Sequence, residues 1–598
     1  MVDAITIRND EVERVNMNNN DKIKWYQDAR FGIFIHFGLY TATEGRYKGK
    51  ETQGIGEWIQ SREQIPCSDY EAFASKLTLE NFDPEYWAEL AYNAGMRYCV
   101  FTAKHHDGFA MYDTKYDDYS IVRRSPYGDD PLRKVIDAMR KKGIMPCVYY
   151  SHSIDFHEPN AMGNMWDFTK PYDERDFKSY IDGKCKFQLR ELLTNYGEIG
   201  ILWFDMPWEI SDEIAEDITS FVRSLQPNCL ISGRISYSEG FSDFGCYGDN
   251  DVPTYTGDGV WETAATMNRT WGYKCDDHDF RPTNELVEQL CSLSARNTNF
   301  LLNVGPDCKG DIPEESISIL KEMAKWMKQG KEAIHNTSGS PFIANFSFGD
   351  VTQKDDELLL YIYKPVDKIS ILGIRSKVIS ITDVYDNEIT FSQYNEELLI
   401  DCSNVVFDKY VTILKAQLNG KLKIREGVFQ QERDTIIITP YSFKVYETVK
   451  NDGVSGSAET DVAIVAERKN DYTIMRSCYE GVVNWFSTSN YITATFEVLC
   501  PGDYIVSLLT RSAKYTPWVG GHEMTLECNG QTISSILKED FATTGAPRKY
   551  YYETGSDIGE IRIDKPGVYT LKLRANHIND KDSAGVVLSY IHFKRKKV

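Results

Sequence analysis

The sequence predicts three consecutive domains: an N-terminal (β/α)8-like barrel, an all-β sandwich and a C-terminal β jelly roll. Up to about residue 340, short apolar segments alternate with helical segments, whereas the remainder alternates polar and apolar residues between polar turns. Two joints, 336–341 and 451–459, are rich in Gly, Ser or Asp and interrupt these patterns. We therefore expect the domains at 1–340, 341–450 and 451–598.

Apolar segments of the first domain are predicted to be the strands of the barrel. Most are apolar on both faces, which is typical of parallel strands that are buried between a barrel interior and a layer of helices. The predicted strands are 31–38, 96–105, 144–151, 199–205, 229–235 and 299–306.

Helices between these strands have clear start and stop signals. Asp83–Pro84 and Asp130–Pro131 fit an N-cap followed by the first helical residue, and Gly95 and Gly143 follow the same helices. Repeated strand–helix units favour a (β/α)8 barrel, closed by an amphipathic helix at about 313–335, over a doubly wound sheet. No GxGxxG or P-loop follows any predicted strand, which weakens a nucleotide-binding alternative.

Period-two alternation predicts antiparallel strands in the rest of the chain. In the second domain these are 357–364, 377–385, 410–414 and 434–447. The third domain places Trp485 and Trp518 in predicted loops, which resembles carbohydrate-binding modules. Packing of the domain's own core is the simpler interpretation, and glycan binding by 451–598 is the alternative.

Composition excludes several classes of partner. The 598 residues contain 67 Lys and Arg against 89 Asp and Glu, and the formal charge of −22 has the wrong sign for a nucleic-acid binder. No segment approaches the ~20 consecutive apolar residues of a membrane helix, so we expect no membrane partner. The first 20 residues lack the features of a signal peptide, which favours the cytoplasm, with periplasm or secretion as the alternative if a signal was removed.

Cysteine spacing gives no indication of a metal or disulfide framework. The 13 cysteines are scattered singly, without a CxxC pair. His36, His105, His106 and His152 are candidate metal ligands, but adjacent His side chains do not easily point at one ion, and no HExxH is present. We expect neither a metal nor a cofactor. The absence of a GxSxG elbow also argues against a serine hydrolase.

Polar side chains are predicted at the carboxyl ends of the barrel strands, where barrel enzymes carry their active sites. Burying such groups is costly unless they are paired or used. Trp203 and Phe34 add flat apolar surface for the C–H face of a sugar ring, and the 37 Tyr and 11 Trp of the chain suit a sugar-binding protein. The polar residues are His36, 104–107, 149–152, Asp205, Arg234 and Asn303.

Two carboxyl groups complete this set. Asp205 ends the apolar segment ILWFD, and Glu262 lies on a predicted loop that can reach over the barrel mouth. Two carboxyl groups that flank a glycosidic bond are the minimum equipment of a glycoside hydrolase.

At these residues the sequence resembles the α-L-fucosidases of glycoside hydrolase family 29. The similarity covers essentially the whole first domain, and KHHDGF, WFD and LLNVGP are its specific blocks. The resemblance implies that Asp205 is the nucleophile. It also implies fucose-binding positions at His36, His105, His106, Tyr150, Trp203 and Arg234, with Tyr149 as the alternative to Tyr150.

The resemblance leaves the proton donor open. Glu262 matches the acid/base of members with a Trp-Glu motif ahead of a WGY segment. Glu57 matches a sugar-binding Glu that serves as acid/base in some relatives. The segment 248–259 departs from the family pattern, and its Asp249 and Asp251 are further candidates.

The expected activity is therefore that of an exo-acting retaining α-L-fucosidase on fucosylated oligosaccharides or glycoconjugates. Asp205 would attack the anomeric carbon while Glu262 protonates the departing oxygen, with carboxyl groups ~5–5.5 Å apart. Phe34 is expected to line the corner occupied by the methyl group of fucose. A related exo-glycosidase with relaxed galactoside specificity and an inactive fucose-binding lectin are the alternatives.

Overall fold

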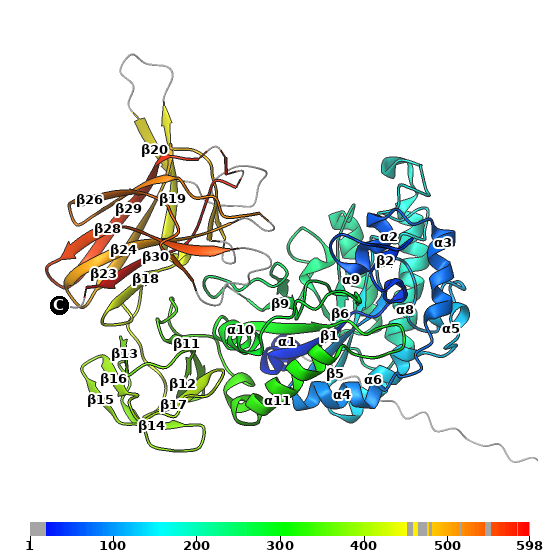
Figure 1. Cartoon of the computed structure of the whole chain (residues 1–598), viewed down its shortest axis with the longest axis horizontal. Helices are drawn as coiled ribbons and strands as arrows, with labels where there is room; N and C mark the ends of the chain where they lie inside the picture. Colours follow the sequence, from blue (N-terminus) through cyan, green and yellow to red (C-terminus); the bar gives the residue numbers. More distant parts are fainter. Residues whose placement is uncertain are drawn as a thin grey trace, which may run out of the picture.

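The computed structural model describes residues 19–257, 259–450, 459–463, 475–477, 481–512, 516–543, 552–579, 581–582 and 584–596. It consists of a barrel with helices around it and two all-β domains on one side of the barrel (Figure 1). Most of the predicted joint 451–459, and Tyr515 of the predicted aromatic loop 515–521 that contains Trp518, lie outside the described residues.

Eight parallel strands form the barrel, in the order β7-β6-β5-β4-β1-β10-β9-β8. A single parallel bridge between Ser232 and Phe244 joins the two ends of this sheet and closes it. The predicted (β/α)8-like barrel is confirmed, and each predicted strand segment overlaps one strand. β8 and β9 were not predicted. The strands are β1 Phe31–Ile35, β4 Tyr98–Lys104, β5 Met145–Tyr150, β6 Ile201–Phe204, β7 Leu230–Ile231, β8 Gly245–Cys246, β9 Trp261–Thr266 and β10 Thr298–Val304.

The helices around the barrel begin where the sequence predicted. Asp83 and Asp130 accept hydrogen bonds from the backbone N–H groups of Tyr86 and Arg133, both at 2.9 Å, and so cap α4 and α6. The predicted closing helix is α11. The longer helices are α1 Asn19–Ala29, α4 Pro84–Asn93, α6 Pro131–Lys141, α8 Lys186–Asn195, α9 Asp212–Leu225, α10 Thr283–Ala295 and α11 Glu314–Ile334.

Shorter elements decorate the loops of the barrel. The helices α2 Ile59–Arg62 and α3 Cys67–Glu71 and the hairpin β2 Arg46–Tyr47 and β3 Lys50–Glu51 follow β1. Later in the chain come α5 Ile121–Arg124 and α7 Phe177–Tyr180.

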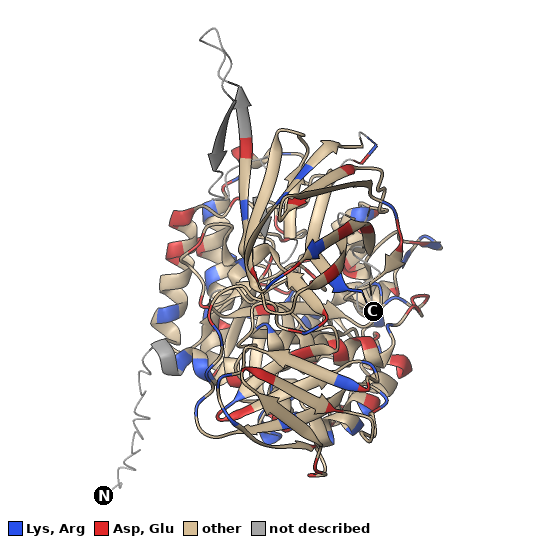
Figure 2. Ribbon diagram, turned by 90° about the vertical axis from the view of Figure 1, so that its left-hand side faces the viewer, with Lys and Arg blue, Asp and Glu red and all other residues tan. Residues whose placement is uncertain are grey.

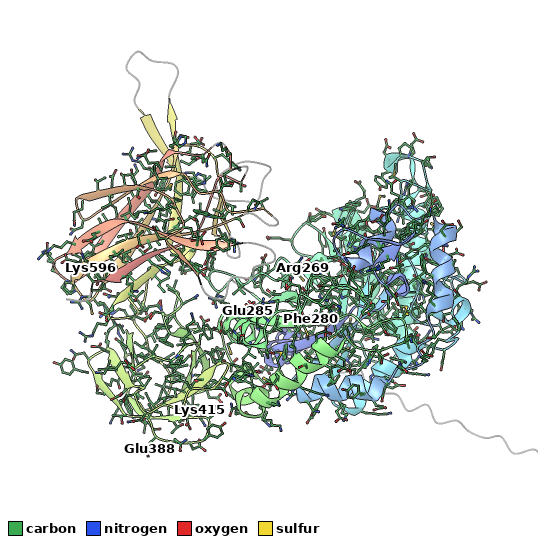
Figure 3. The ribbon with its side chains drawn as sticks, viewed as in Figure 1. Arg269, Phe280, Glu285, Glu388, Lys415 and Lys596 are labelled. Atoms are coloured by element: carbon green, nitrogen blue, oxygen red, sulfur yellow. The ribbon has the colours of Figure 1, made fainter. Side chains whose placement is uncertain are left out.

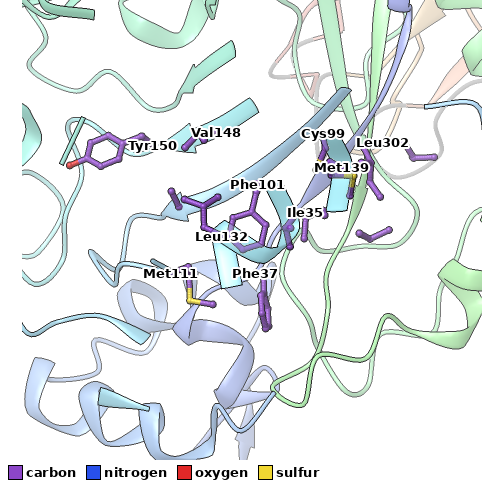
Figure 4. Packing of buried hydrophobic residues seen from close by; sticks show 14 of the residues in the cluster. Ile35, Phe37, Cys99, Phe101, Met111, Leu132, Met139, Val148, Tyr150 and Leu302 are labelled. Carbon is purple, nitrogen blue, oxygen red and sulfur yellow. The ribbon is translucent and has the colours of Figure 1, made fainter. Parts of the chain in front are cut away.

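Strand alternation separates two layers of side chains. Phe34, Tyr149 and Trp203 belong to a cluster inside the barrel, which Tyr26 of α1 also joins. Their chain neighbours point outward and pack against the helices, as Ile35 and Val148 do in Figure 4. The polar strand tips at the mouth therefore stand above an apolar, closely packed interior.

The second domain is a small β-sandwich. One sheet has the order β11-β12-β17-β14 and the other β13-β16-β15, and they enclose a common apolar core. The strands are β11 Gly349–Lys354, β12 Glu357–Ile362, β13 Lys368–Leu372, β14 Val378–Asp383, β15 Phe391–Tyr394, β16 Glu397–Asp401 and β17 Thr412–Leu418.

The third domain consists of two larger antiparallel sheets around one core. The first has the order β21-β22-β30-β24-β28-β27, with β18 beside β30, and the second β20-β19-β23-β29-β25-β26. The strands are β18 Thr435–Ile438, β19 Phe443–Lys450, β20 Glu459–Ala463, β21 Met475–Ser477, β22 Gly481–Trp485, β23 Asn490–Val498, β24 Gly502–Arg511, β25 Glu523–Cys528, β26 Gln531–Ile536, β27 Phe541–Ala542, β28 Glu553–Ile563, β29 Gly567–His577 and β30 Val586–Arg595.

The predicted boundary at residue 450 is wrong. β18 pairs with β30, and β19 pairs with β23, so the segment 434–447 belongs to the third domain. The alternation of these strands was identified correctly, but alternation does not show which sheet a strand joins.

The aromatics singled out in the third domain pack against its core. Trp485 is fully buried within it. Trp518 packs against the same core, and its Nε1 donates a hydrogen bond to Thr510 Oγ1 at 3.1 Å. Packing accounts for both side chains.

Charged residues of both signs are interspersed along the helices and strands (Figure 2). Within the described part of the chain, no helix combines the length and the apolar character needed to cross a bilayer.

A buried ion network supports one side of the barrel mouth. Asp155 Oδ2 lies 3.0 Å from Lys104 Nζ and 2.9 Å from Lys184 Nζ, and all three side chains are almost fully buried. Lys104 ends β4, and the backbone N–H of Phe156, next to Asp155, donates to His106 O at 2.7 Å. The network therefore ties the loop after β5 to the tip of β4.

We predict that Asp155→Asn destabilises the protein by about 3–5 kcal/mol, because two buried ammonium groups lose their carboxylate. Thermal or urea unfolding of the full chain measures this effect. Asp386→Asn is the control, because its partner Lys415 lies on the outer part of the second domain (Figure 3) and Asp386 is 83% exposed. Equal unfolding midpoints for the two variants would contradict the prediction.

Candidate active site

A cavity of about 80 Å³ opens at the carboxyl ends of the barrel strands. It brings together most of the site residues that the sequence predicted, together with several that it did not. The lining residues are Phe34, His36, Ile55, Glu57, Trp58, His105, Tyr149, Trp203, Asp205, Met206, Arg234, Asp249 and Trp271.

Asp205 directly follows β6 and presents its carboxylate to this cavity. Its Oδ1 accepts a hydrogen bond from Arg234 Nη1 at 3.0 Å, and its Oδ2 accepts one from the Tyr149 hydroxyl at 3.1 Å. His106 Nε2 lies 3.6 Å from Oδ2. Although burial alone would raise the pKa of Asp205, Arg234 and His106 hold it below its ordinary value. The carboxylate is therefore ionised.

Arg234 joins two carboxylates. Its Nη1 contacts Asp205, its Nη2 contacts Asp249, and its guanidinium lies 5.0 Å from the Trp203 ring centroid. Burial works against the charge of Arg234, but the two aspartates raise its pKa. One cation thus contacts two acidic side chains in the same cavity.

The position of Arg234 depends on a close approach of the chain. A Cβ on the preceding residue, Gly233, would lie 2.9 Å from both Phe244 O and Cys246 N. This glycine therefore lets the end of β7 contact β8 where the barrel closes.

His36 follows β1 and has a defined tautomer. Asn303 Nδ2 donates to Trp271 O at 2.8 Å, so Asn303 Oδ1 accepts from His36 Nδ1 at 2.6 Å. Burial lowers the pKa of His36 to about 3. The ring is neutral, and its Nε2 is an acceptor for a ligand hydroxyl.

His105 and His106 have different surroundings. His106 Nδ1 contacts Ser151 Oγ at 2.7 Å, and Ser151 Oγ donates to Ile154 O, so His106 donates from Nδ1 and directs Nε2 at Asp205. The His105 ring stacks on Tyr149, and burial lowers its pKa. His105 Nδ1 has no hydrogen-bond partner among the described residues. A ligand hydroxyl would satisfy it.

Glu57 lies in a short 3-10 turn, Gly56–Trp58, with only 2% of its surface exposed. Its Oε2 accepts from the Gly272 N–H at 2.9 Å and from Thr270 Oγ1 at 3.3 Å. Its Oε1 lacks a partner within the part of the chain that the structure describes. Burial raises the pKa of Glu57 to about 7.

The predicted position of Glu262 on a loop over the mouth is wrong. Glu262 is the second residue of β9 and points into the barrel, 1% exposed and outside the cavity lining. Its Oε1 accepts from Trp203 Nε1 at 2.7 Å, and its Oε2 accepts from the hydroxyls of Tyr26 and Tyr98 at 2.6 and 2.8 Å. This geometry makes Glu262 a support beneath Trp203 rather than a proton donor to a ligand.

Tyr150 does not face the cavity either. Its hydroxyl donates to Gln188 Oε1 at 2.8 Å, and the ring lies in the outer apolar layer (Figure 4). Tyr149, the alternative, points inward. Phe300 also lies outside the cavity, stacked on Phe31.

Other lining residues were missed. Trp58 and Trp271 lie in loops after β1 and β9. They belong to the GEW and WGY segments, and these aromatic residues near a candidate carboxyl group could have indicated a role in the cavity. Of the two candidate aspartates in 248–259, Asp249 lines the cavity, whereas Asp251 is buried and does not line it. No cluster of three or more His, Cys, Asp or Glu in the described ranges is arranged to hold a metal ion.

The sequence is similar to known proteins over the barrel domain. The sequence model of the family described as Alpha-L-fucosidase matches residues 4–332. The Alpha-L-fucosidase of Dictyostelium discoideum is 26% identical over 344 residues, which are 52% of this chain and 71% of the relative.

Solved structures extend the similarity to the β domains. The alpha-L-fucosidase from Vibrio sp. strain EJY3 is 25% identical with a TM-score of 0.81, over 97% of this chain and 100% of that chain. The alpha-L-fucosidase from Lactobacillus casei in complex with alpha-L-fucose product is 34% identical with a TM-score of 0.50, over 52% of this chain and 100% of that chain. Because the family model covers more than half of the sequence and the structural match spans nearly all of it, the chain belongs to the alpha-L-fucosidase family, glycoside hydrolase family 29.

Proposed function

We propose that this chain releases terminal α-L-fucose from fucosylated glycans with retention of configuration, through a covalent bond between the sugar and Asp205. The observation that carries the proposal is the ionised carboxylate at the tip of β6, aligned by Arg234 and Tyr149 and facing the cavity. An ionised and oriented carboxylate is what a retaining nucleophile requires. The similar Lactobacillus casei enzyme, which binds α-L-fucose, supports fucose as the sugar.

We assign the acid/base role to Asp249 instead of Glu262. Asp249 shares the Arg234 guanidinium with Asp205 and lines the same cavity, so both carboxyl groups can reach one bound sugar, as the two carboxyl groups of a retaining glycosidase do. Its side chain is 32% exposed, so it lies at the open side of the cavity, where the leaving group departs. Glu57 is the second candidate because its raised pKa favours the protonated form.

The reaction has two steps. An Asp205 carboxylate oxygen attacks the anomeric carbon, the glycosidic C–O bond breaks, and its electron pair stays on the departing oxygen, which takes a proton from Asp249. Asp249 must enter this step protonated, so binding of the substrate has to release its ion pair with Arg234. Asp249 then removes a proton from water. The water oxygen attacks the same carbon, and the bond to Asp205 breaks and returns its electron pair to the carboxylate. Fucose leaves with its original anomeric configuration.

Residues opposite Asp205 select the sugar. The Nε2 of His36, the Nδ1 of His105 and the Oε1 of Glu57 are free to bond sugar hydroxyls. Phe34 supplies apolar surface for the methyl group, which distinguishes fucose only modestly from galactose-like sugars.

Asp205→Ala should lower kcat/KM for an aryl α-L-fucoside by at least about 10³-fold, because no other group is placed to form the covalent bond. A fluorinated fucosyl reagent should label Asp205 in the unaltered enzyme, as read by peptide mass spectrometry. The control is Asp212→Ala, on the exposed first turn of α9, which should keep full activity. A label on another residue would refute the mechanism.

Asp249→Ala should lower the rate on a fucoside with a poor leaving group by about 10²–10⁴-fold, and much less on an activated aryl fucoside. Azide, which needs no general base, should accelerate turnover of the activated substrate and yield fucosyl azide. Glu57→Ala and Glu262→Gln should show no azide effect. Azide rescue of the Glu57 variant would move the acid/base role to that residue.

Glu57 should also make stability depend on pH. Its pKa rises from 4.5 in the unfolded chain to about 7 in the fold, so its favourable contribution is complete below pH 4.5 and is lost as pH rises through 7. The wild type should therefore lose about 3 kcal/mol relative to Glu57→Gln between these values. Unfolding midpoints of both proteins across this range measure the difference, and parallel curves would contradict it.

A further inference from the structure

The loop that carries Asp249 runs from the barrel to the third domain. Residues 247–260 connect β8 to β9 and, together with Trp261 at the start of β9, are called the 247–261 loop here; residue 258 lies outside the described residues. At its far end the ring of Tyr255 meets the ring of Tyr441 edge to face, with centroids 5.7 Å apart. Tyr441 belongs to the third domain, in the turn Pro440–Ser442 between β18 and β19.

The base of the 247–261 loop is fixed to the barrel. The rings of Tyr247 and Trp261 stack at 4.5 Å where the loop leaves and re-enters the barrel wall. Asn250, next to Asp249, donates from its backbone N–H to Ala264 O at 2.8 Å, and its Oδ1 accepts from the Thr266 N–H at 2.9 Å. Asp249 thus lies directly beside an anchored residue.

The middle of the loop lies where the three domains meet. Val252 and Thr254 line a cavity of about 240 Å³ together with Tyr363 of the second domain and Tyr590 of the third. Glu285 of α10 lines the same cavity and lies on the side of the barrel that faces the β domains (Figure 3). Beyond Asn250, the loop therefore packs against all three domains and not against the barrel alone.

We infer that Tyr441 of the third domain is a positioning residue for Asp249, acting through Tyr255 and the 247–261 loop. The inference rests on the proposed acid/base role of Asp249. Anchors at the base restrain the backbone at residue 250, and the tyrosine contact restrains the far end, so the carboxyl of Asp249 keeps its position at the cavity. The third domain then contributes to catalysis without touching the substrate.

The test compares substrates that differ in their need for an acid. Tyr441→Ala in the full chain should lower kcat/KM roughly 2- to 10-fold on a fucoside with a poor leaving group, the range that loss of an aromatic pair provides. The rate on an activated aryl fucoside should be unchanged, because that leaving group departs without protonation. Tyr441→Phe keeps the ring and should retain the wild-type ratio between the two substrates.

Matched variants separate positioning from a general structural effect. Tyr394→Ala removes a tyrosine that is 78% exposed on β15 and should change neither rate. Tyr255→Ala should reproduce the effect of Tyr441→Ala, and the double variant should be no worse than either single one, because both remove the same contact.

Two different outcomes would overturn the positioning inference, and they differ in what they say of the proposed function. If Tyr441→Ala and Tyr255→Ala keep the wild-type ratio while azide still rescues Asp249→Ala, the positioning inference is overturned and the proposed function stands. If azide fails to rescue Asp249→Ala, the acid/base assignment fails first, and the positioning role fails with it.

Discussion

The guanidinium of Arg234 is the interaction on which the site depends. Two carboxylates close together in a buried cavity repel each other by several kcal/mol at an effective dielectric constant of about 20. A cation between them replaces this repulsion with two attractions, and the face of Trp203 supports that cation from below. Gly233 lets the chain approach β8 closely where the barrel closes. The same contact that closes the barrel therefore also positions Arg234 between the two carboxylates.

Support for the site continues downward through the barrel. Glu262 holds the indole N–H of Trp203 from beneath, and the hydroxyls of Tyr26 and Tyr98 hold Glu262. Tyr26 comes from α1, so the first described helix is linked by hydrogen bonds to the floor of the cavity. A carboxyl group outside the cavity lining therefore still fixes the position of Trp203, which lines the cavity.

The barrel and the position of Asp205 at its mouth could be predicted from the sequence, because apolar strands and polar strand tips are local patterns. Tyr149 and Tyr150 could not be separated in this way. Both faces of β5 are apolar, so alternation alone does not show which face is inside. The position of Glu262 was predicted wrongly for a related reason. Its three hydrogen-bond donors, Tyr26, Tyr98 and Trp203, come from distant parts of the chain, and only the fold brings them together.

The same limit explains the domain boundary. β18 and β19 alternate as clearly as the strands of the sandwich, but the sheet to which they belong is decided by pairing partners later in the chain, β30 for β18 and β23 for β19. The acidic segment 248–259 likewise gave two candidate aspartates, and only the turn of the backbone after Cys246 separates the one at the cavity from the buried one.

The place of β30 has a consequence for synthesis of the chain. This strand follows all others in sequence, yet it lies inside its sheet and pairs with β18, β22 and β24. The barrel has all its strands once residue 304 has left the ribosome, whereas the third domain holds incomplete sheets until β30 arrives. Nascent chains therefore carry unpaired strand edges from the synthesis of β18 at residue 435 until β30 begins at residue 586, and in this interval they are most exposed to aggregation and to chaperone capture.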